Sequence, residues 1–364
     1  MSETSRVDRV RAGMREAGVD TLLLSLGADL PWLTGYAPHE SERLTMLVLP
    51  VDDQATMVVP ELEAPKVTER PDVFRIQPWR ETEDPIDAVA RLVGNRRSLA
   101  VSDRAWSYFL LRLQAAIPEA TWQPASVVTT PLRARKDAAE IDALRKAAES
   151  ADRVAAALLK GEIPLIGRTE KAVSSDIARR LREEGHDRVG FSIVGSGPNG
   201  ASPHHDASDR VINAGEAVVC DFGGWVDGYC SDITRTVFTG DPPGEFVELY
   251  TVLQRAQAAA VDAATVGTPC EEVDGVARRI ITEAKFGELF IHRTGHGIGL
   301  EGHEHPYLVK GNTEPLAAGH AFSIEPGIYV PGMWGARIED IVVATDDGPS
   351  PLNLADPDLN VVEA

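Results

Sequence analysis

Apolar and polar residues along the first third of the chain follow both helical and strand-like spacings. A first helix is expected after Thr4 or Ser5, either of which can cap it, and should end at Gly18. Its apolar residues share one face, namely Val7, Val10 and Met14. The other expected elements are, in chain order, strands at 21–26, 46–49 and 55–59 and helices at 85–93 and 108–117. Strands that alternate with helices predict an α/β domain with a partly parallel sheet.

A longer amphipathic pattern follows the segment 131–136. Between 137 and 159 apolar residues recur at intervals of three and four, which predicts one long helix with a single buried face. Further helices are expected at 170–184, where Thr169 can act as the cap, at 245–265 and at 271–284. The length of the chain suits two domains. We place an amino-terminal α/β domain at residues 1–130 and a second domain at 131–364.

Two β-rich runs within 217–238 surround a turn at 225–228, which predicts an antiparallel hairpin. If the turn is centred between Val226 and Asp227, Asp221 and Asp232 lie directly opposite each other. Two opposed carboxylates destabilise a sheet, unless they share a proton or cations lie between them. The second explanation is the sharper hypothesis, and it predicts a metal site.

A second hairpin, within 321–344, repeats the pattern around the Gly-rich connection 330–335. When this hairpin is centred on Gly332, Glu325 and Glu339 are opposed on strands that are otherwise largely apolar. The alternative is a solvated carboxylate on an outer face. That alternative suits Asp340 better than Glu339, because neighbouring residues on a strand point to opposite faces.

His296 lies between the two hairpins, in a segment whose glycines let the backbone approach a ligand closely. Taken alone, a histidine is more often structural than a metal ligand. Together with the four carboxylates it completes a set of oxygen donors and one imidazole. Such a set is typical of a pair of divalent ions such as Mn²⁺, and not of a thiolate-rich zinc site. The three cysteines have no CxxC spacing, which also argues against thiolate ligands.

The composition limits the partners of the chain. Its 364 residues include 36 basic and 56 acidic ones, and the net charge of −20 argues against nucleic acid and acidic membranes as partners. No apolar run approaches the roughly 18 residues of a membrane span, and the first residues lack the apolar core of a signal peptide. We therefore expect a cytoplasmic protein that binds neither nucleic acid nor a membrane.

Four segments carry a family resemblance: DFGGWVDGYCSDITRT from 221, RTGHGIGLEGHEHP from 293, AFSIEPGIYVPG from 321 and ARIED from 336. They resemble the Xaa-Pro peptidases, prolidase and aminopeptidase P, among the pita-bread metallopeptidases. The resemblance is strong over 131–364 and weak over the first domain. It implies a creatinase-like amino-terminal α/β domain and an α+β pita-bread catalytic domain, in which helices back a curved antiparallel sheet. A homodimer is also expected, because this amino-terminal domain packs against a partner subunit in relatives.

The resemblance implies a role for each candidate ligand. Asp221 would bind one ion, and Asp232 and Glu339 would bridge both. His296 and Glu325 would complete the other site, and Glu325 would also carry the proton from the attacking water to the leaving nitrogen. The two ions would most simply be Mn²⁺, with Co²⁺ or Zn²⁺ as alternatives, because ligand affinity alone does not select the ion in a cell.

Further residues are assigned by the same resemblance. His204 would hydrogen-bond to the substrate or the tetrahedral intermediate, and His303 would bind the oxygen of the scissile carbonyl. Strand alternation, without the resemblance, places Arg337 on the same side as Glu339, where it would orient the carboxylates; a solvent-facing arginine is the alternative. His205 replaces a residue that is small in relatives, and His305 one that is often acidic in dipeptidases. The roles of these two are left open.

Trp32 lies in the segment 29–36, which resembles a loop and strand of the family's amino-terminal domain. In relatives this domain helps to wall the active site of a partner subunit. Trp32 is therefore a candidate for a neighbour's pocket, and a core tryptophan is the alternative.

The expected reaction is hydrolysis of the amino-terminal Xaa-Pro bond of a dipeptide or short peptide by a dinuclear metal centre. A methionine-aminopeptidase-like or other amidohydrolase activity on the same fold is one alternative. A non-catalytic binding module is another, although such modules and creatinase-like enzymes should have lost the metal ligands. The sequence does not choose between dipeptides and longer peptides, because that choice depends on what blocks the far end of the cleft.

Overall fold

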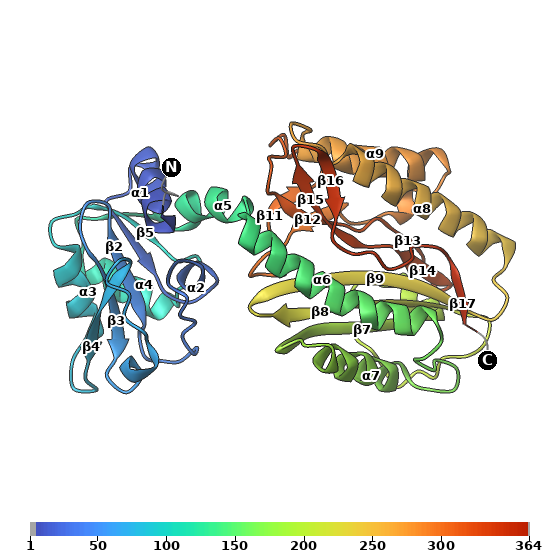
Figure 1. The fold of residues 1–364 in the computed structure, drawn as a ribbon, viewed down its shortest axis with the longest axis horizontal. Coiled ribbons are helices and arrows are strands. Elements are labelled where there is room, and N and C mark those ends of the chain that lie inside the picture. Colours follow the sequence, from blue (N-terminus) through green and yellow to red (C-terminus); the bar gives the residue numbers. More distant parts are fainter. Residues whose placement is uncertain (1–4, 363–364) are drawn as a thin grey trace. The chain divides into compact units, whose positions relative to one another are not determined.

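The computed structural model describes residues 5–362. The chain divides into two compact units, Met1–Arg133 and Ala134–Ala364, which Figure 1 shows coloured along the sequence. Helix α5 (Ser126–Ala134) ends at this division. Among the described residues, the helices fall short of the length and apolar character that a bilayer span requires.

Within the described part of the first unit, six strands form a mixed sheet in the order β4-β3-β2-β1-β5-β6. The central strand β1 pairs parallel to β5 and antiparallel to β2, so the predicted α/β arrangement is confirmed. The strands are β1 (Thr21–Leu24), β2 (Met46–Pro50), β3 (Ala55–Pro60), β4 (Phe74–Trp79), β5 (Ser98–Val101) and β6 (Thr121–Pro124). The helices before α5 are α1 (Arg6–Ala17), α2 (Asp29–Thr34), the short η1 (Ala64–Lys66), α3 (Pro85–Val93) and α4 (Ser107–Ala116).

The first two helices show one correct and one wrong expectation. Ser5 caps α1 by accepting a hydrogen bond from the Asp8 backbone, and Gly18 ends the helix in the left-handed conformation. The other candidate cap, Thr4, lies outside the described residues. The segment expected to form a loop and strand is instead helix α2, which Gly35 terminates at φ 76°. Trp32 on α2 is buried in its own unit, which supports the core alternative.

The second unit contains two main sheets. Among its described residues, four strands follow the order β17-β9-β8-β7 and five the order β11-β10-β12-β15-β16, with β13 and β14 as a separate pair. The strands are β7 (Arg188–Ser196), β8 (Ala217–Val226), β9 (Tyr229–Thr239), β10 (Gly295–Gly297), β11 (Glu304–Leu308), β12 (Ala321–Ile324), β13 (Gly327–Val330), β14 (Trp334–Arg337), β15 (Asp340–Thr345), β16 (Gly348–Pro351) and β17 (Asn360–Val362). The helices are α6 (Ala138–Leu159), α7 (Glu170–Glu183), η2 (Gly197–Ala201), α8 (Gly244–Ala263), α9 (Cys270–Glu283) and η3 (Gly287–Leu289).

Each sheet of this unit is backed by a pair of helices, as Figure 1 shows. The apolar faces of α6 and α7 share one core with β7, β8 and β9, and those of α8 and α9 share another with β12 to β15. The long helix begins with a reciprocal capping box between Asp137 and Glu140, and Thr169 caps α7 as expected. The predicted α+β architecture is therefore confirmed.

The first hairpin has a different register from the predicted one. Asp221 on β8 pairs with Thr234 on β9, and Asp232 pairs with Gly223. The turn consists of Asp227 and Gly228 alone, both with positive φ (50° and 85°). Two-residue turns of this kind are common in hairpins because their twist matches that of the strands. They require positive φ at both central residues, which Asp and Gly tolerate. Direct opposition of the two aspartates is therefore wrong; they lie diagonally on the same face of the hairpin.

The second hairpin keeps the register centred on Gly332, but its strands are interrupted. β12 pairs with β15 and β13 with β14 in one common register. Glu325 lies in the break between β12 and β13, and Glu339 in the break between β14 and β15. Glu339 forms an isolated bridge with Thr234 of the other sheet. The break at Glu339 therefore brings the two hairpins together.

The position of Asp340 differs from the solvated outer-face position expected from the sequence. Its carboxylate is buried, and it accepts hydrogen bonds from Arg235 Nη2 at 2.7 Å and from Gln257 Nε2 at 2.9 Å. Arg235 is itself fully buried, and it also donates to the Glu339 carbonyl. The outer-face reading is wrong for Asp340 because alternation on a strand says which side a residue faces, and here helix α8 covers that side with Gln257.

Candidate metal centre

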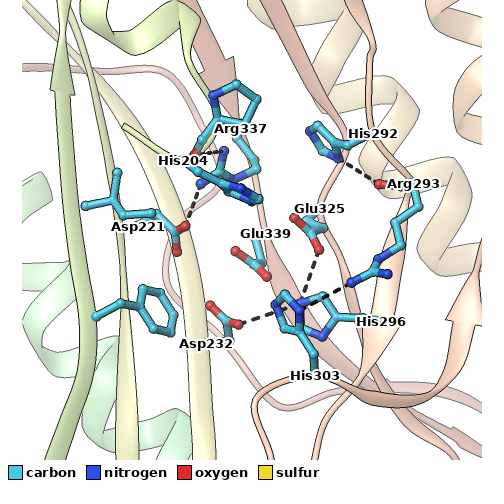
Figure 2. A pocket seen from close by; sticks show the side chains of 13 residues that line it. His204, Asp221, Asp232, His292, Arg293, His296, His303, Glu325, Arg337 and Glu339 are labelled. Atoms are coloured by element: carbon cyan, nitrogen blue, oxygen red, sulfur yellow. Dashed lines mark hydrogen bonds and ion pairs between the residues drawn. The ribbon is translucent and has the colours of Figure 1, made fainter. Parts of the chain in front are cut away.

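A cavity of about 550 Å³ lies in the second unit, and Figure 2 shows the side chains that line it. All eight site residues expected from the sequence lie in its wall. The lining residues are Phe191, Ile193, Pro203, His204, Asp221, Asp232, His292, Arg293, His296, His303, Glu325, Arg337 and Glu339. The two hairpins and the His296 segment, distant in sequence, thus meet at one place.

Three buried candidate ligands converge most closely. Atoms of Asp232, His296 and Glu339 that can bind a metal lie within 4.8 Å of one another. Glu325 joins them, since its Oε1 lies 3.3 Å from His296 Nε2. His296 Nδ1 donates to the carbonyl of Gly297 at 3.1 Å, which leaves Nε2 directed at the carboxylates, as Figure 2 shows.

The carboxylates crowd one another electrostatically. Burial, with the charges of Glu339 and Asp221, raises the pKa of Asp232 well above its usual range. Burial and the charge of Glu325 likewise raise the pKa of Glu339, and burial raises the pKa of Glu325 to about 7. Burial also lowers the pKa of His296 to about 3, so its imidazole is neutral and can act as a ligand. Cations between these groups would relieve the repulsion.

Asp221 provides an independent test of whether the residues fit metal ions. Its Oδ2 accepts a hydrogen bond from Arg337 Nη2 at 2.5 Å. Its Oδ1 is buried and has no hydrogen-bond partner among the described residues. An unpaired buried oxygen is costly, and such groups usually have a partner. Carboxylate donors with one imidazole suit divalent ions such as Mn²⁺, so the residues present fit the metal centre.

Arg337 helps to hold the carboxylates in place through hydrogen bonds. Its side chain is buried, so the solvent-facing alternative is wrong. Besides Asp221, it donates from Nε to Thr234 Oγ1 at 3.1 Å and from Nη1 to the Tyr329 hydroxyl at 2.8 Å. Thr234 in turn donates to Glu339 Oε2 at 2.6 Å. One guanidinium and one hydroxyl therefore fix the orientation of two candidate ligands.

His303 and His204 face the cavity from opposite sides in Figure 2. The His303 ring lies against that of His296, with centroids 3.8 Å apart. Arg293 Nη2 donates to His303 Nδ1 at 3.3 Å, which places the proton of the neutral ring on Nε2. Burial and the Arg293 charge both lower the pKa of His303, which favours that neutral form.

The sequence reasoning missed several residues of this site. His292 donates from Nδ1 to the Arg293 carbonyl at 2.7 Å and accepts at Nε2 from the Tyr329 hydroxyl at 2.9 Å. Burial and the charge of Arg337 lower the pKa of His292 to about 4, so it stays neutral. Proximity to His296 was the available signal for His292 and Arg293. Nothing in the local pattern distinguishes Tyr329, because its role depends on Arg337.

The fold and the site define a metallopeptidase with two domains. Residues 142–346 match the model of metallopeptidase family M24, and residues 6–135 match the creatinase/prolidase N-terminal domain. The chain therefore belongs to metallopeptidase family M24, whose activity implies divalent metal ions. The predictions of the family and of the pita-bread fold class are confirmed.

Relatives match along nearly the whole chain. A probable dipeptidase PepE of Mycobacterium tuberculosis is 43% identical over 362 residues, which cover 98% of this chain and 96% of the relative. An Xaa-Pro dipeptidase of Lactobacillus delbrueckii subsp. lactis is 35% identical over 364 residues, which cover 98% of each chain. The crystal structure of dipeptidase PepE from Mycobacterium ulcerans is 44% identical and superposes with a TM-score of 0.93, covering 99% of this chain and 97% of that chain.

Proposed function

We propose that the chain hydrolyses the amino-terminal Xaa-Pro bond of a dipeptide or short peptide with a dinuclear metal centre. The carrying observation is the convergence of four carboxylates, three of them buried, and one neutral imidazole in a single cavity. Relatives named Xaa-Pro dipeptidase support the substrate class. All of these residues lie in the second unit, which supports residues 131–364 as the catalytic domain.

Two divalent ions would be held by the candidate ligands Asp221, Asp232, His296, Glu325 and Glu339. Mn²⁺ is our proposed ion, with Co²⁺ or Zn²⁺ as alternatives. When bound, such ions lower the pKa of a water molecule to about 7 and so supply a nucleophile at neutral pH. The buried Asp221 Oδ1 gives the clearest support for metal binding by these ligands, because no hydrogen-bond donor among the described residues satisfies this atom.

The chain's own residues would hold the substrate and move the proton. Glu325 would take a proton from the attacking water and pass it to the leaving nitrogen. His303 would donate from Nε2 to the carbonyl oxygen as that oxygen becomes negative, because Arg293 occupies its Nδ1. His204, on the facing wall, would contact the substrate or the tetrahedral intermediate. Arg337 would keep Asp221 in place throughout.

The rest of the cavity wall supports a small substrate that contains proline. The nitrogen of an Xaa-Pro bond carries no hydrogen, so the site needs to accept the ring and not an N–H group. Phe191 and Ile193 on β7 supply apolar surface for that ring. The guanidinium of Arg293 also lines the cavity, and it suits the free carboxylate of a dipeptide. We therefore favour dipeptides over longer peptides.

Metal analysis combined with assays of Ala-Pro, Ala-Pro-Ala and a peptide that begins with Met tests this function. Metal-dependent hydrolysis of Ala-Pro is expected, with weaker hydrolysis of Ala-Pro-Ala. Hydrolysis of the Met peptide alone would favour a methionine-aminopeptidase-like activity. A protein that binds no metal and cleaves none of the three would favour the binding module. We further propose a cytoplasmic homodimer, which light scattering and cell fractionation can test.

A further inference from the structure

A buried carboxylate at the start of α7 gathers the segment between β7 and β8. Glu170 is fully buried and accepts hydrogen bonds from Ser196 N at 2.9 Å and Ser208 N at 3.0 Å. The hydroxyls of these two serines donate to it as well, at 2.7 and 2.6 Å. Asn199 Nδ2 adds a contact at 3.0 Å, and His205 Nε2 lies 2.8 Å from Glu170 Oε2. One side chain thus anchors residues 196–208.

The Glu170 carboxylate is ionised at neutral pH. Burial by itself would raise the pKa of Glu170, but the hydrogen bonds from Ser208, Ser196 and His205 outweigh it and lower the pKa to about 2. Hydrogen bonds to an ionised acceptor are shorter and stronger than those between neutral groups. Arg210 extends the network, because its Nη1 donates to Ser196 Oγ at 2.7 Å.

His204 lies between two fixed points of this segment. The carbonyl of Pro203, the residue before it, accepts a hydrogen bond from Arg337 Nη1 at 3.4 Å. The imidazole of His205, the residue after it, contacts Glu170, and the His205 backbone closes a turn onto the Ser202 carbonyl at 3.2 Å. His204 itself is exposed and lines the cavity, as Figure 2 shows. The two histidines therefore serve different sides of the same backbone.

We propose that His205 is a positioning residue that acts through His204. Its bond to the Glu170 carboxylate fixes the turn, so that the His204 imidazole stays directed at the cavity. This inference rests on the proposed function, in which His204 contacts the substrate. A displacement of a contacting group by about 1 Å can reduce the rate 10²-fold, so loss of this bond has a measurable consequence.

The first test compares His205→Ala with His205→Gln. We expect His205→Ala to lower kcat for Ala-Pro by about 10–100-fold, the usual cost of losing a residue that supports an active-site group. The bound metal should not change. His205→Gln should restore most of the activity, because its amide nitrogen can donate from the same place to Glu170. Asp206→Asn, which changes the neighbouring exposed residue, serves as the control and should match the wild type.

A double-mutant cycle separates positioning from a general loss of structure. If His205 acts through His204, replacing both residues by Ala should lower kcat for Ala-Pro no further than His204→Ala does alone. The proposal would be overturned if His205→Ala lowered kcat in the His204→Ala variant by the same factor as in the wild type. A wild-type kcat for His205→Ala would overturn it as well.

Hydrogen exchange of the backbone amides in 202–208 gives a readout that does not depend on catalysis. Exchange in metal-loaded His205→Ala should be faster than in the wild type, and His205→Gln should slow it again. Unchanged exchange would refute the anchor whatever the activity. If the metal-loaded wild type fails to cleave Ala-Pro, the proposed function falls, and the exchange result still decides whether Glu170 and His205 hold this segment.

Discussion

Arg337 Nη2 donates to Asp221 Oδ2 at 2.5 Å, and both side chains are buried beside the cavity. This contact neutralises part of the charge of a carboxylate cluster that water cannot reach freely. It also occupies one oxygen of Asp221 and leaves the other buried without a hydrogen-bond partner among the described residues. The arginine thus both stabilises the site and orients a candidate ligand.

Replacing Arg337 with Ala should destabilise the metal-free protein by about 3–5 kcal/mol, because it leaves a buried carboxylate unpaired. Arg179 is a matched control, since it pairs with Glu183 on the exposed face of α7, where such a pair is worth about 0–1 kcal/mol. Urea unfolding of both variants measures the difference. An equal, small effect of the two substitutions would contradict the structural role of Arg337.

Thr234→Val should weaken metal binding by about 10–100-fold, because residues that hold a ligand in place typically matter to that degree. The hydroxyl of Thr234 donates to Glu339 and accepts from Arg337, and Val keeps the shape while removing both bonds. Titration calorimetry with Mn²⁺ provides the measurement. Thr236→Val is the control, because the Thr236 hydroxyl bonds the backbone of Arg337 instead. Similar Mn²⁺ affinities in the two variants would argue against this role of Thr234.

His303→Ala should lower kcat for Ala-Pro by about 10²–10³-fold, as the loss of one donor to a developing oxyanion does. The amount of bound metal should stay the same, which distinguishes this role from that of a ligand. His305→Ala provides a comparison in the same segment, since the His305 ring packs against Tyr307. Near-normal turnover of His303→Ala would remove His303 from the reaction.

Glu170 gives a prediction for the pH dependence of stability. Its pKa of about 2 in the folded protein lies below the ordinary value, so ionised Glu170 stabilises the fold. That contribution is complete above about pH 5 and is lost as the pH falls toward 2. The difference in unfolding free energy between the wild type and Glu170→Gln should therefore shrink over this range. Urea unfolding of the metal-free proteins tests this, and a difference independent of pH would refute it.

The sequence predicted those features that depend on local patterns. The apolar face of α6, the cap Thr169 and the register about Gly332 all follow from spacing and from turn or cap chemistry. The β8–β9 register was predicted wrongly because the centre of the turn was misplaced by one residue. Asp227-Gly228 closes that hairpin alone, and a shift of the centre by one residue replaces Asp232 by Thr234 opposite Asp221.

Features of the site that depend on tertiary contacts are harder to predict from the sequence. The burial of Asp340 follows from Arg235 and Gln257, which lie far from it in sequence. The link between Tyr329 and Arg337 depends on how β13 and β14 pair, and no spacing rule encodes that hydrogen bond. Likewise, the contact between His205 and Glu170 joins two segments whose patterns give no sign of each other.

The number of Mn²⁺ ions that the purified chain binds after metal removal and reloading tests the central claim most directly. Two ions per chain are expected for the wild type, and fewer for Asp232→Asn, since Asp232 would bridge both. A wild-type stoichiometry of one or zero, or an unchanged stoichiometry in Asp232→Asn, would contradict a dinuclear centre at these residues.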